Sequence, residues 1–285
     1  MKNCLLLNLG LALISVSVDA KEEFCAPPNR MREDVFLANT THTFELEIDT
    51  LFLQPMSGNL HYAAEATPLP APSPNWKIHE ISTDYHFGFD LGLKGVFHST
   101  STNLSVNWER LHATDSASKQ VPSSDMVGPF FEIGPDATLY KKAYGQVQFE
   151  FDRVNADYGI GIQWGDRLRG NFFSGVSLAR IKQTLFSQYS SLDDTTVRSI
   201  NVPSSFLGAG PQLGLDFSYR IVEGFCFTGK LATSFLVGTQ KNHTDYEALS
   251  PALAGLGISP PNRQSTHVHK KTQVVPGFEG KLGLD

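Results

Sequence analysis

The sequence predicts an all-β fold, an antiparallel transmembrane β-barrel with about eight strands, on three observations. Many segments alternate apolar and polar residues with a period of two, and the connections between them alternate between short and long. The composition is rich in glycine and phenylalanine, with 24 and 20 residues among 285, and only 18% of the residues are charged, below the usual quarter. A membrane barrel needs such alternation because one face of each strand contacts lipid and the other faces the lumen.

The clearest alternation lies in residues 86–97, where phenylalanine or leucine occupies nearly every second position and polar residues or glycine occupy the others. Residues 43–53 place Phe44, Leu46 and Ile48 on one face and three acids on the other. The segment 103–110 repeats this pattern. Further strands are predicted in residues 147–162, 172–185, 212–219, 225–237 and 272–284.

One of these segments changes phase. Its apolar residues lie at odd positions from Val147 to Phe151 and at even positions from Val154 to Ile162. A bulge or an unrecognised turn near Arg153 would explain the change.

The connections favour a membrane barrel over a soluble β-sandwich. Short links are predicted at 99–102, 165–169 and 222–224, and long polar loops at 56–84, 112–144, 187–203 and 239–271. Outer-membrane barrels have short periplasmic turns and long external loops. A soluble sandwich also alternates along its strands but has no reason for this asymmetry, so it stays as the alternative.

The N-terminal residues predict export. Lys2, an apolar stretch and Val18-Asp19-Ala20 form a signal peptide over residues 1–20, which leaves 21–285 as the barrel domain. No later apolar run is long enough for a membrane helix. The predicted location is therefore the cell outer membrane.

Because the chain stops at Asp285 inside an expected strand, we also expect a truncated barrel whose closure is in question.

Charge and cysteine content exclude some classes of protein. The net charge of −6 argues against a nucleic-acid partner, which would require a basic face. Only Cys25 and Cys226 remain after cleavage, so a disulfide-rich scaffold is excluded. Whether these two cysteines pair stays open.

No arrangement of residues indicates an enzyme, a cofactor or a metal site. His267 and His269 lie two apart but have no third ligand, so a polar loop is the better interpretation. The loop acids do not have the spacing of a calcium site; they are Asp84, Asp115, Asp125, Asp136 and Asp245. The chain has no Gly-x-Ser-x-Gly motif.

The charges on the presumed lumen faces are the candidate selectivity residues. Eight are acids and three are lysines: Glu45, Glu47, Asp49, Asp90, Glu109, Glu150, Asp152 and Glu279, with Lys94, Lys230 and Lys281. Such charges need water or mutual pairing. Their acidic excess predicts a water-filled, cation-preferring lumen. The alternative is a lumen filled by salt-bridged side chains, because about eight strands leave little free space.

The chain also resembles the Legionella-type major outer membrane protein family. The resemblance spans nearly the whole mature chain and is carried by six segments: 53–65, 73–79, 85–90, 128–135, 261–269 and 274–284. It implies an outer-membrane barrel with porin-like activity, abundant at the surface and, in some members, involved in host-cell contact. Family members continue through further strands beyond Leu284, unlike this chain.

Three functions follow as hypotheses. The first is a porin for passive diffusion of ions and small polar solutes, with outer-membrane lipid around it. The second is a surface-exposed structural or adhesin barrel with a filled lumen. The third is a secreted soluble β-protein. Self-association into a homo-oligomer and contact with a host-cell surface stay open.

Overall fold

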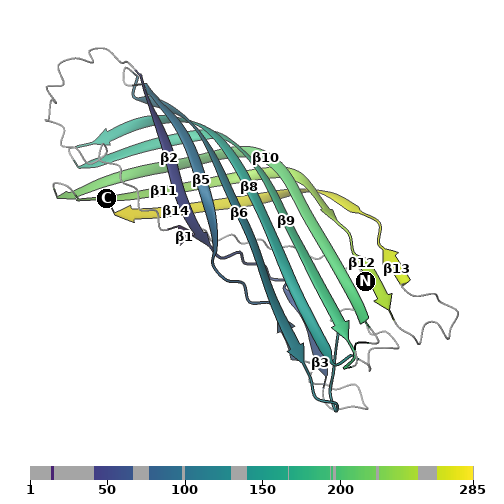
Figure 1. Ribbon diagram of the computed structural model, residues 1–285. Coiled ribbons are helices and arrows are strands. Elements are labelled where there is room, and N and C mark those ends of the chain that lie inside the picture. Colours follow the sequence, from purple (N-terminus) through teal and green to yellow (C-terminus); the bar gives the residue numbers. More distant parts are fainter. Residues whose placement is uncertain are drawn as a thin grey trace.

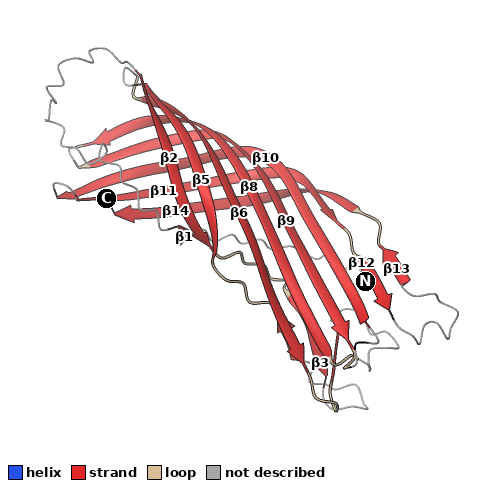
Figure 2. Ribbon diagram, in the orientation of Figure 1, coloured by secondary structure: helices blue, strands red, loops and turns tan. Residues whose placement is uncertain are grey.

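A computed structural model gives the fold of this chain (Figure 1). It describes residues 14–15, 42–66, 77–97, 100–129, 140–165, 167–192, 194, 197–222, 225–249 and 262–284. Within these residues the regular structure consists of strands without helices (Figure 2). In particular, the described part of the chain contains no helix long and apolar enough to cross a membrane.

Eight long strands form one curved antiparallel sheet. They are β2 (His42–Leu53), β5 (His86–Phe97), β6 (Thr102–Gln120), β8 (Lys142–Trp164), β9 (Leu168–Ser190), β10 (Val197–Val222), β11 (Phe225–Asn242) and β14 (His269–Leu284). Each long strand pairs with the next along the chain, in the order β2-β5-β6-β8-β9-β10-β11-β14. The predicted all-β antiparallel fold is confirmed, and each of the eight predicted strand segments falls within one of these long strands.

The barrel was predicted with its closure in question, and no closed barrel is found among the described residues. The first and last of the long strands, β2 and β14, share no hydrogen-bonded register. The sheet nevertheless curls enough for Lys281 on β14 to lie 2.8 Å from Asp90 on β5 and 3.9 Å from Asp49 on β2. The concave side, which we call the inner face, is therefore lined by side chains from both edges. A two-residue strand, β1 (Ile14–Ser15), pairs in parallel with β14; the rest of the predicted signal peptide lies outside the described residues.

The short and long connections fall at opposite ends of the sheet (Figure 1). The predicted short links are confirmed at 98–101, 165–167 and 223–224, which define the turn end. Gly165 has a φ of 66°, a left-handed conformation that glycine adopts without steric cost. At the other end, the loop end, β6, β8, β9, β10 and β11 continue well into the segments predicted as loops.

The predicted bulge near Arg153 is wrong. β8 pairs with β6 and with β9 through unbroken registers, and its odd-numbered residues face inward along most of its length. The apolar phase changes because the environment of each face changes along the strand. Toward the loop end, Phe149 and Phe151 are buried inside; toward the turn end, Tyr158 and Ile160 are exposed outside.

The outer face is correspondingly divided into two zones. Toward the turn end it carries exposed apolar side chains, which we call the outer belt: Phe44, Leu46, Ile48, Phe52, Leu93, Leu104, Val106, Val154, Tyr158, Ile160, Phe172, Val176, Leu178, Leu207, Leu213, Leu231, Phe235, Val237, Val274, Phe278 and Leu282. Toward the loop end the same face carries polar side chains such as Arg110, Gln148 and Arg180. The long loops were predicted too long, because these strand ends lack an apolar outer face.

A second, three-stranded sheet covers the inner face at the loop end. It consists of β4 (Lys77–Glu80), β3 (His61–Ala66) and β7 (Met126–Gly128). Tyr62 packs there with Val147 and Tyr189 in a buried apolar cluster, and the Tyr189 hydroxyl donates a hydrogen bond to the Tyr62 carbonyl. Two further short strands, β12 (Asp245–Leu249) and β13 (Asn262–Ser265), extend the main sheet beside β10.

An ion pair fixes the small sheet to the main one. Glu65 lies 2.7 Å from His79 and 3.5 Å from Lys119 on β6. Partial burial opposes ionisation of Glu65, but the hydrogen bond to His79 and the charge of Lys119 outweigh it and hold the pKa of Glu65 below its ordinary value.

Close contact between the two sheets gives a first prediction. A Cβ atom at Gly145 would lie 2.5 Å from the Cβ of Tyr62. Gly145→Ala is therefore expected to lower the free energy of unfolding by about 1–3 kcal/mol, the usual cost of overpacking. The matched control is Gly128→Ala on β7, where a Cβ meets nothing within 4 Å. Urea unfolding of both variants checks this, and equal stability would contradict the packing described here.

Candidate functional site on the inner face

The candidate site is a polar cavity on the inner face, within the half of the sheet that carries the outer belt. Its volume is about 170 Å³, far above the roughly 10–15 Å³ that one water molecule needs. Five carboxylates and three lysines line it: Glu47, Asp49, Asp90, Asp157 and Asp216, with Lys94, Lys230 and Lys281. Asparagine and serine side chains line it as well, together with the apolar Phe173, Phe217 and Leu282. The charged and amide groups make the cavity suited to water and cations.

Alternation along the strands directs these side chains inward. On β5, Asp90 and Lys94 occupy inner positions between outward-facing Phe89, Leu91 and Leu93. On β14, Glu279 is buried whereas its neighbour Phe278 is 72% exposed. A one-residue shift in register would exchange the two faces, and the unbroken pairing of β11 with β14 prevents that shift.

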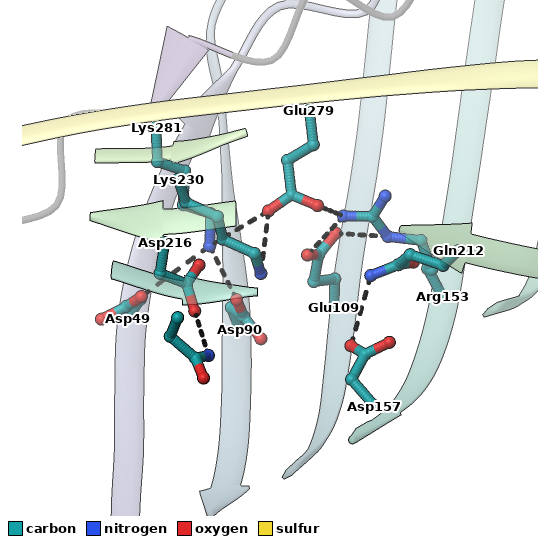
Figure 3. Close-up of polar contacts among 11 residues, drawn as sticks. Asp49, Asp90, Glu109, Arg153, Asp157, Gln212, Asp216, Lys230, Glu279 and Lys281 are labelled. Carbon is teal, nitrogen blue, oxygen red and sulfur yellow. Dashed lines mark hydrogen bonds and ion pairs between the residues drawn. The ribbon is translucent and has the colours of Figure 1, made fainter. Parts of the chain in front are cut away.

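An ion cluster centred on Arg153 adjoins the cavity, because its member Glu279 pairs with two lysines of the cavity lining (Figure 3). The guanidinium donates to Glu109 at 3.0 and 2.6 Å and to Glu279 at 2.5 Å. These three side chains come from β8, β6 and β14, and all are buried. Glu109 and Arg153 are cross-strand partners on neighbouring strands, whereas the Arg153–Glu279 pair joins β8 to β14, which are not neighbours in the sheet, so this pair crosses the interior.

Two lysines continue the ion cluster. Lys230 lies 3.3 Å from Glu279, and Lys281 donates to Asp90 at 2.8 Å. Figure 3 shows both lysines directed toward the acids of β2, β5 and β14. Two further carboxylates of the lining, for which no ion pair is found among the described residues, are held by amides instead. Asn171 donates to Asp216 at 3.1 Å, and Gln212 donates to Asp157 at 3.3 Å.

Apolar side chains separate the cavity from the loop end. Leu51, Leu111 and Phe151 form one buried cluster beside the Arg153 group, and Phe206 and Leu236 belong to a second. The inner face therefore changes from polar to apolar at about the level where the outer face changes from apolar to polar.

The structure brings together most of the predicted selectivity residues but not all. Glu45 lies 3.8 Å from Lys94, beside the cavity, and the remaining inward-facing members have been described above. Glu150 and Asp152 lie on the outer face, because the inward positions of β8 are the odd ones. Glu150 accepts from Lys182 at 2.7 Å and Asp152 lies 3.7 Å from Arg110. Both were predicted to face the lumen because Phe149 and Phe151, with which they alternate, were expected to face lipid.

Three inner residues were missed from the sequence: Arg153, Asp157 and Asp216. Arg153 was assigned to the supposed bulge. Asp157 alternates with Ala156 and Tyr158, and Asp216 alternates with Leu215 and Phe217, so the period-two signal was present at both positions. No local signal indicates that Arg153 meets Glu279, which is 126 positions away.

The remaining polar candidates lie outside the cavity. His86 contacts Asp115 at 3.0 Å, and Asp245 accepts from Ser265 at 2.6 Å. His267 and His269 are exposed at the loop end. Asp136 lies outside the described residues.

One of the two cysteines that follow the predicted signal peptide can be placed. Cys226 is buried on β11 and is disulfide-bonded. Cys25, its predicted candidate partner, lies outside the described residues.

A family comparison decides the class of protein. The model of the Legionella pneumophila major outer membrane protein precursor family matches residues 37–285, which is most of the chain. The chain belongs to this family. Membership in this outer membrane protein family supports an outer-membrane location and agrees with the resemblance found in the sequence. No curated protein and no solved structure matches the chain at a significant level.

Proposed function

We propose that the chain spans the outer membrane with its eight-stranded sheet and acts as a porin for small cations and polar solutes. The observation that carries the proposal is the acid-lined cavity on the inner face, behind a continuous apolar belt on the outer face. On β10 the exposed apolar residues of the outer face extend past the belt residue Leu213, from Leu207 to Tyr219, about 41 Å along the strand. At a tilt of about 45° this length covers about 29 Å, close to the thickness of a hydrocarbon core.

The cavity favours cations because carboxylates outnumber lysines in its lining by five to three. Rings of acidic side chains select cations in other channels. Several buried polar atoms nearby, including both amide atoms of Asn155 and the Ser177 hydroxyl, have no described protein partner. Buried polar groups are almost always hydrogen-bonded, which supports a hydrated interior. Arg169 and Arg220 continue the inner face toward the turns and weaken the acidic excess there.

Conductance of purified protein in planar bilayers tests this function. The wild type should conduct cations over anions, and the preference should shrink in molar salt because screening shortens the range of the carboxylate field. Glu47→Gln together with Asp49→Asn should reduce the preference further. The control is Glu150→Gln with Asp152→Asn, the same loss of charge on the outer face. A reversal potential without ion preference at low salt would overturn the selectivity.

The ion cluster favours a second candidate, a structural or adhesin barrel with a filled interior. The Arg153 group crosses the interior, apolar side chains lie beyond it, and eight strands leave room for little more than side chains. This candidate expects no conductance from folded protein. The long connections at the loop end would then carry the function by contacting surface partners.

A further inference from the structure

Two rows of side chains cross the outer face at the edge of the belt that lies toward the loop end. The first row is Arg110, Asp152, Arg180, Leu207, Thr239 and Thr272, and the second is His112, Glu150, Lys182, Ser205, Lys241 and Lys270. Each row follows successive register partners from β6 to β14. Both acids lie on β8 and are paired with Arg110 and Lys182. The part of the rows on β10, β11 and β14 therefore carries only positive charge.

Lys241 and Lys270 are the key pair in this part. They are direct cross-strand partners on β11 and β14, and both are exposed. Neither forms an ion pair with any described residue. Like charges directly opposite each other destabilise a sheet, and an anion placed between them would remove that cost. Thr239, Thr272 and Ser205 add hydroxyl groups around the same point.

A groove on the outer face lies below this basic pair, within the belt. Its outward-facing walls are Phe172, Leu213, Leu231, Thr233, Phe278 and Gly280, from β9, β10, β11 and β14. Thr233 and Gly280 are small residues among larger ones, which leaves the sheet hollowed there. The groove and the basic pair thus share β11 and β14.

The spacing between the groove and the pair fits one amphiphile. From Lys241 to Thr233 is eight positions, about 27 Å along the strand, or about 20 Å along the membrane normal at the usual tilt. Half of a bilayer including its headgroups measures about 20–22 Å. A lipid whose headgroup contacts Lys241 and Lys270 would therefore place its acyl chain in the groove.

We propose that this face binds a phosphate-bearing lipid, with the phosphate between Lys241 and Lys270 and an acyl chain in the groove. Phosphate oxygens accept charge-assisted hydrogen bonds from lysine, whereas the zwitterionic headgroup of phosphatidylcholine carries a cation that the pair would repel. The inference rests on the proposed membrane-spanning arrangement but not on conductance.

The test measures which lipid stays bound to the purified protein. Protein in detergent micelles is mixed with equal amounts of dioleoyl phosphatidic acid and dioleoyl phosphatidylcholine, separated from free micelles, and its lipid is counted by mass spectrometry. The wild type should retain the phosphatidic acid preferentially, and molar salt should reduce this preference. Each basic residue near an anionic surface contributes a factor of roughly five. Lys241→Gln with Lys270→Gln should therefore lower the preference by about 25-fold.

The matched control removes two lysines from other surfaces. Lys271→Gln lies on the opposite face of β14, and Lys77→Gln lies on the small sheet; both residues are exposed. This variant should keep the wild-type preference. Equal retention of the two lipids by the wild type, or equal loss in the control, would overturn the proposal. Failure of the spanning arrangement would appear separately, as protein that does not float with lipid vesicles.

Discussion

Replacing Arg153 with methionine is expected to lower the free energy of unfolding by about 3–5 kcal/mol, the usual cost of removing one partner from a buried ion pair. Methionine keeps much of the apolar stem but cannot donate to Glu109 or Glu279, both of which are buried. Two carboxylates would then be left close together, with only Lys230 and Lys281 nearby to compensate. Unfolding by urea in lipid vesicles, followed by tryptophan fluorescence, measures the loss.

Arg110→Met is the matched control, because it removes the same side chain from an adjacent strand. Its pair with Asp152 is at 3.7 Å on the outer face, and the Arg110 side chain is 55% exposed. Exposed pairs contribute about 0–1 kcal/mol. Adding Glu109→Gln and Glu279→Gln to Arg153→Met should recover part of the lost stability, because the unpaired charges disappear. Equal effects of Arg153→Met and Arg110→Met would show that the cluster is not buried in the folded protein.

The alternation of side chains made the outer and inner faces predictable over most of the sheet. Residues 86–97 and 43–53 lie as predicted, with Phe44, Leu46 and Ile48 outward and the acids inward. The assignment of side chains to a face is correct where the outer face is apolar and the inner face is polar, because an apolar residue then faces outward and a polar residue faces inward. It fails on β8 at Phe149 and Phe151, where the inner face is covered by other parts of the chain and the outer face is polar.

The composition of the ion cluster was only partly accessible from the sequence. Acids and lysines on alternating strands identify inward positions one strand at a time, so Asp90, Glu109 and Lys281 were found. Which of them meet depends on how far the sheet curls. Arg153 contacts Glu279 because β14 comes round to face β8, a tertiary relation that no local pattern contains. Whether the interior is open or filled by side chains depends on these contacts across it, so the sequence alone left both alternatives in place.

Placing an arginine in the outer belt separates a membrane protein from a soluble β-protein. Leu104 and Ser116 lie on the same strand, β6, and both are exposed on its outer face, but only Leu104 is in the belt. If the belt contacts lipid, Leu104→Arg should reduce folding into vesicles, by an amount that rises to about 2–4 kcal/mol for a charge facing lipid at the midplane. Ser116→Arg should change it by less than about 1 kcal/mol, because that position lies beyond the belt.

The pair of variants distinguishes a strand face in lipid from a strand face in water. In water, Leu104→Arg replaces an exposed apolar side chain with a solvated charge, so a soluble sandwich would tolerate both changes alike. The folded fraction in dioleoyl phosphatidylcholine vesicles, measured over a urea series, provides the comparison. Equal tolerance of arginine at the two positions would remove the basis for a membrane-embedded belt and, with it, the porin and the lipid site. A selective loss at Leu104, in contrast, requires an apolar medium around this half of the sheet, since exposure, strand and face are matched.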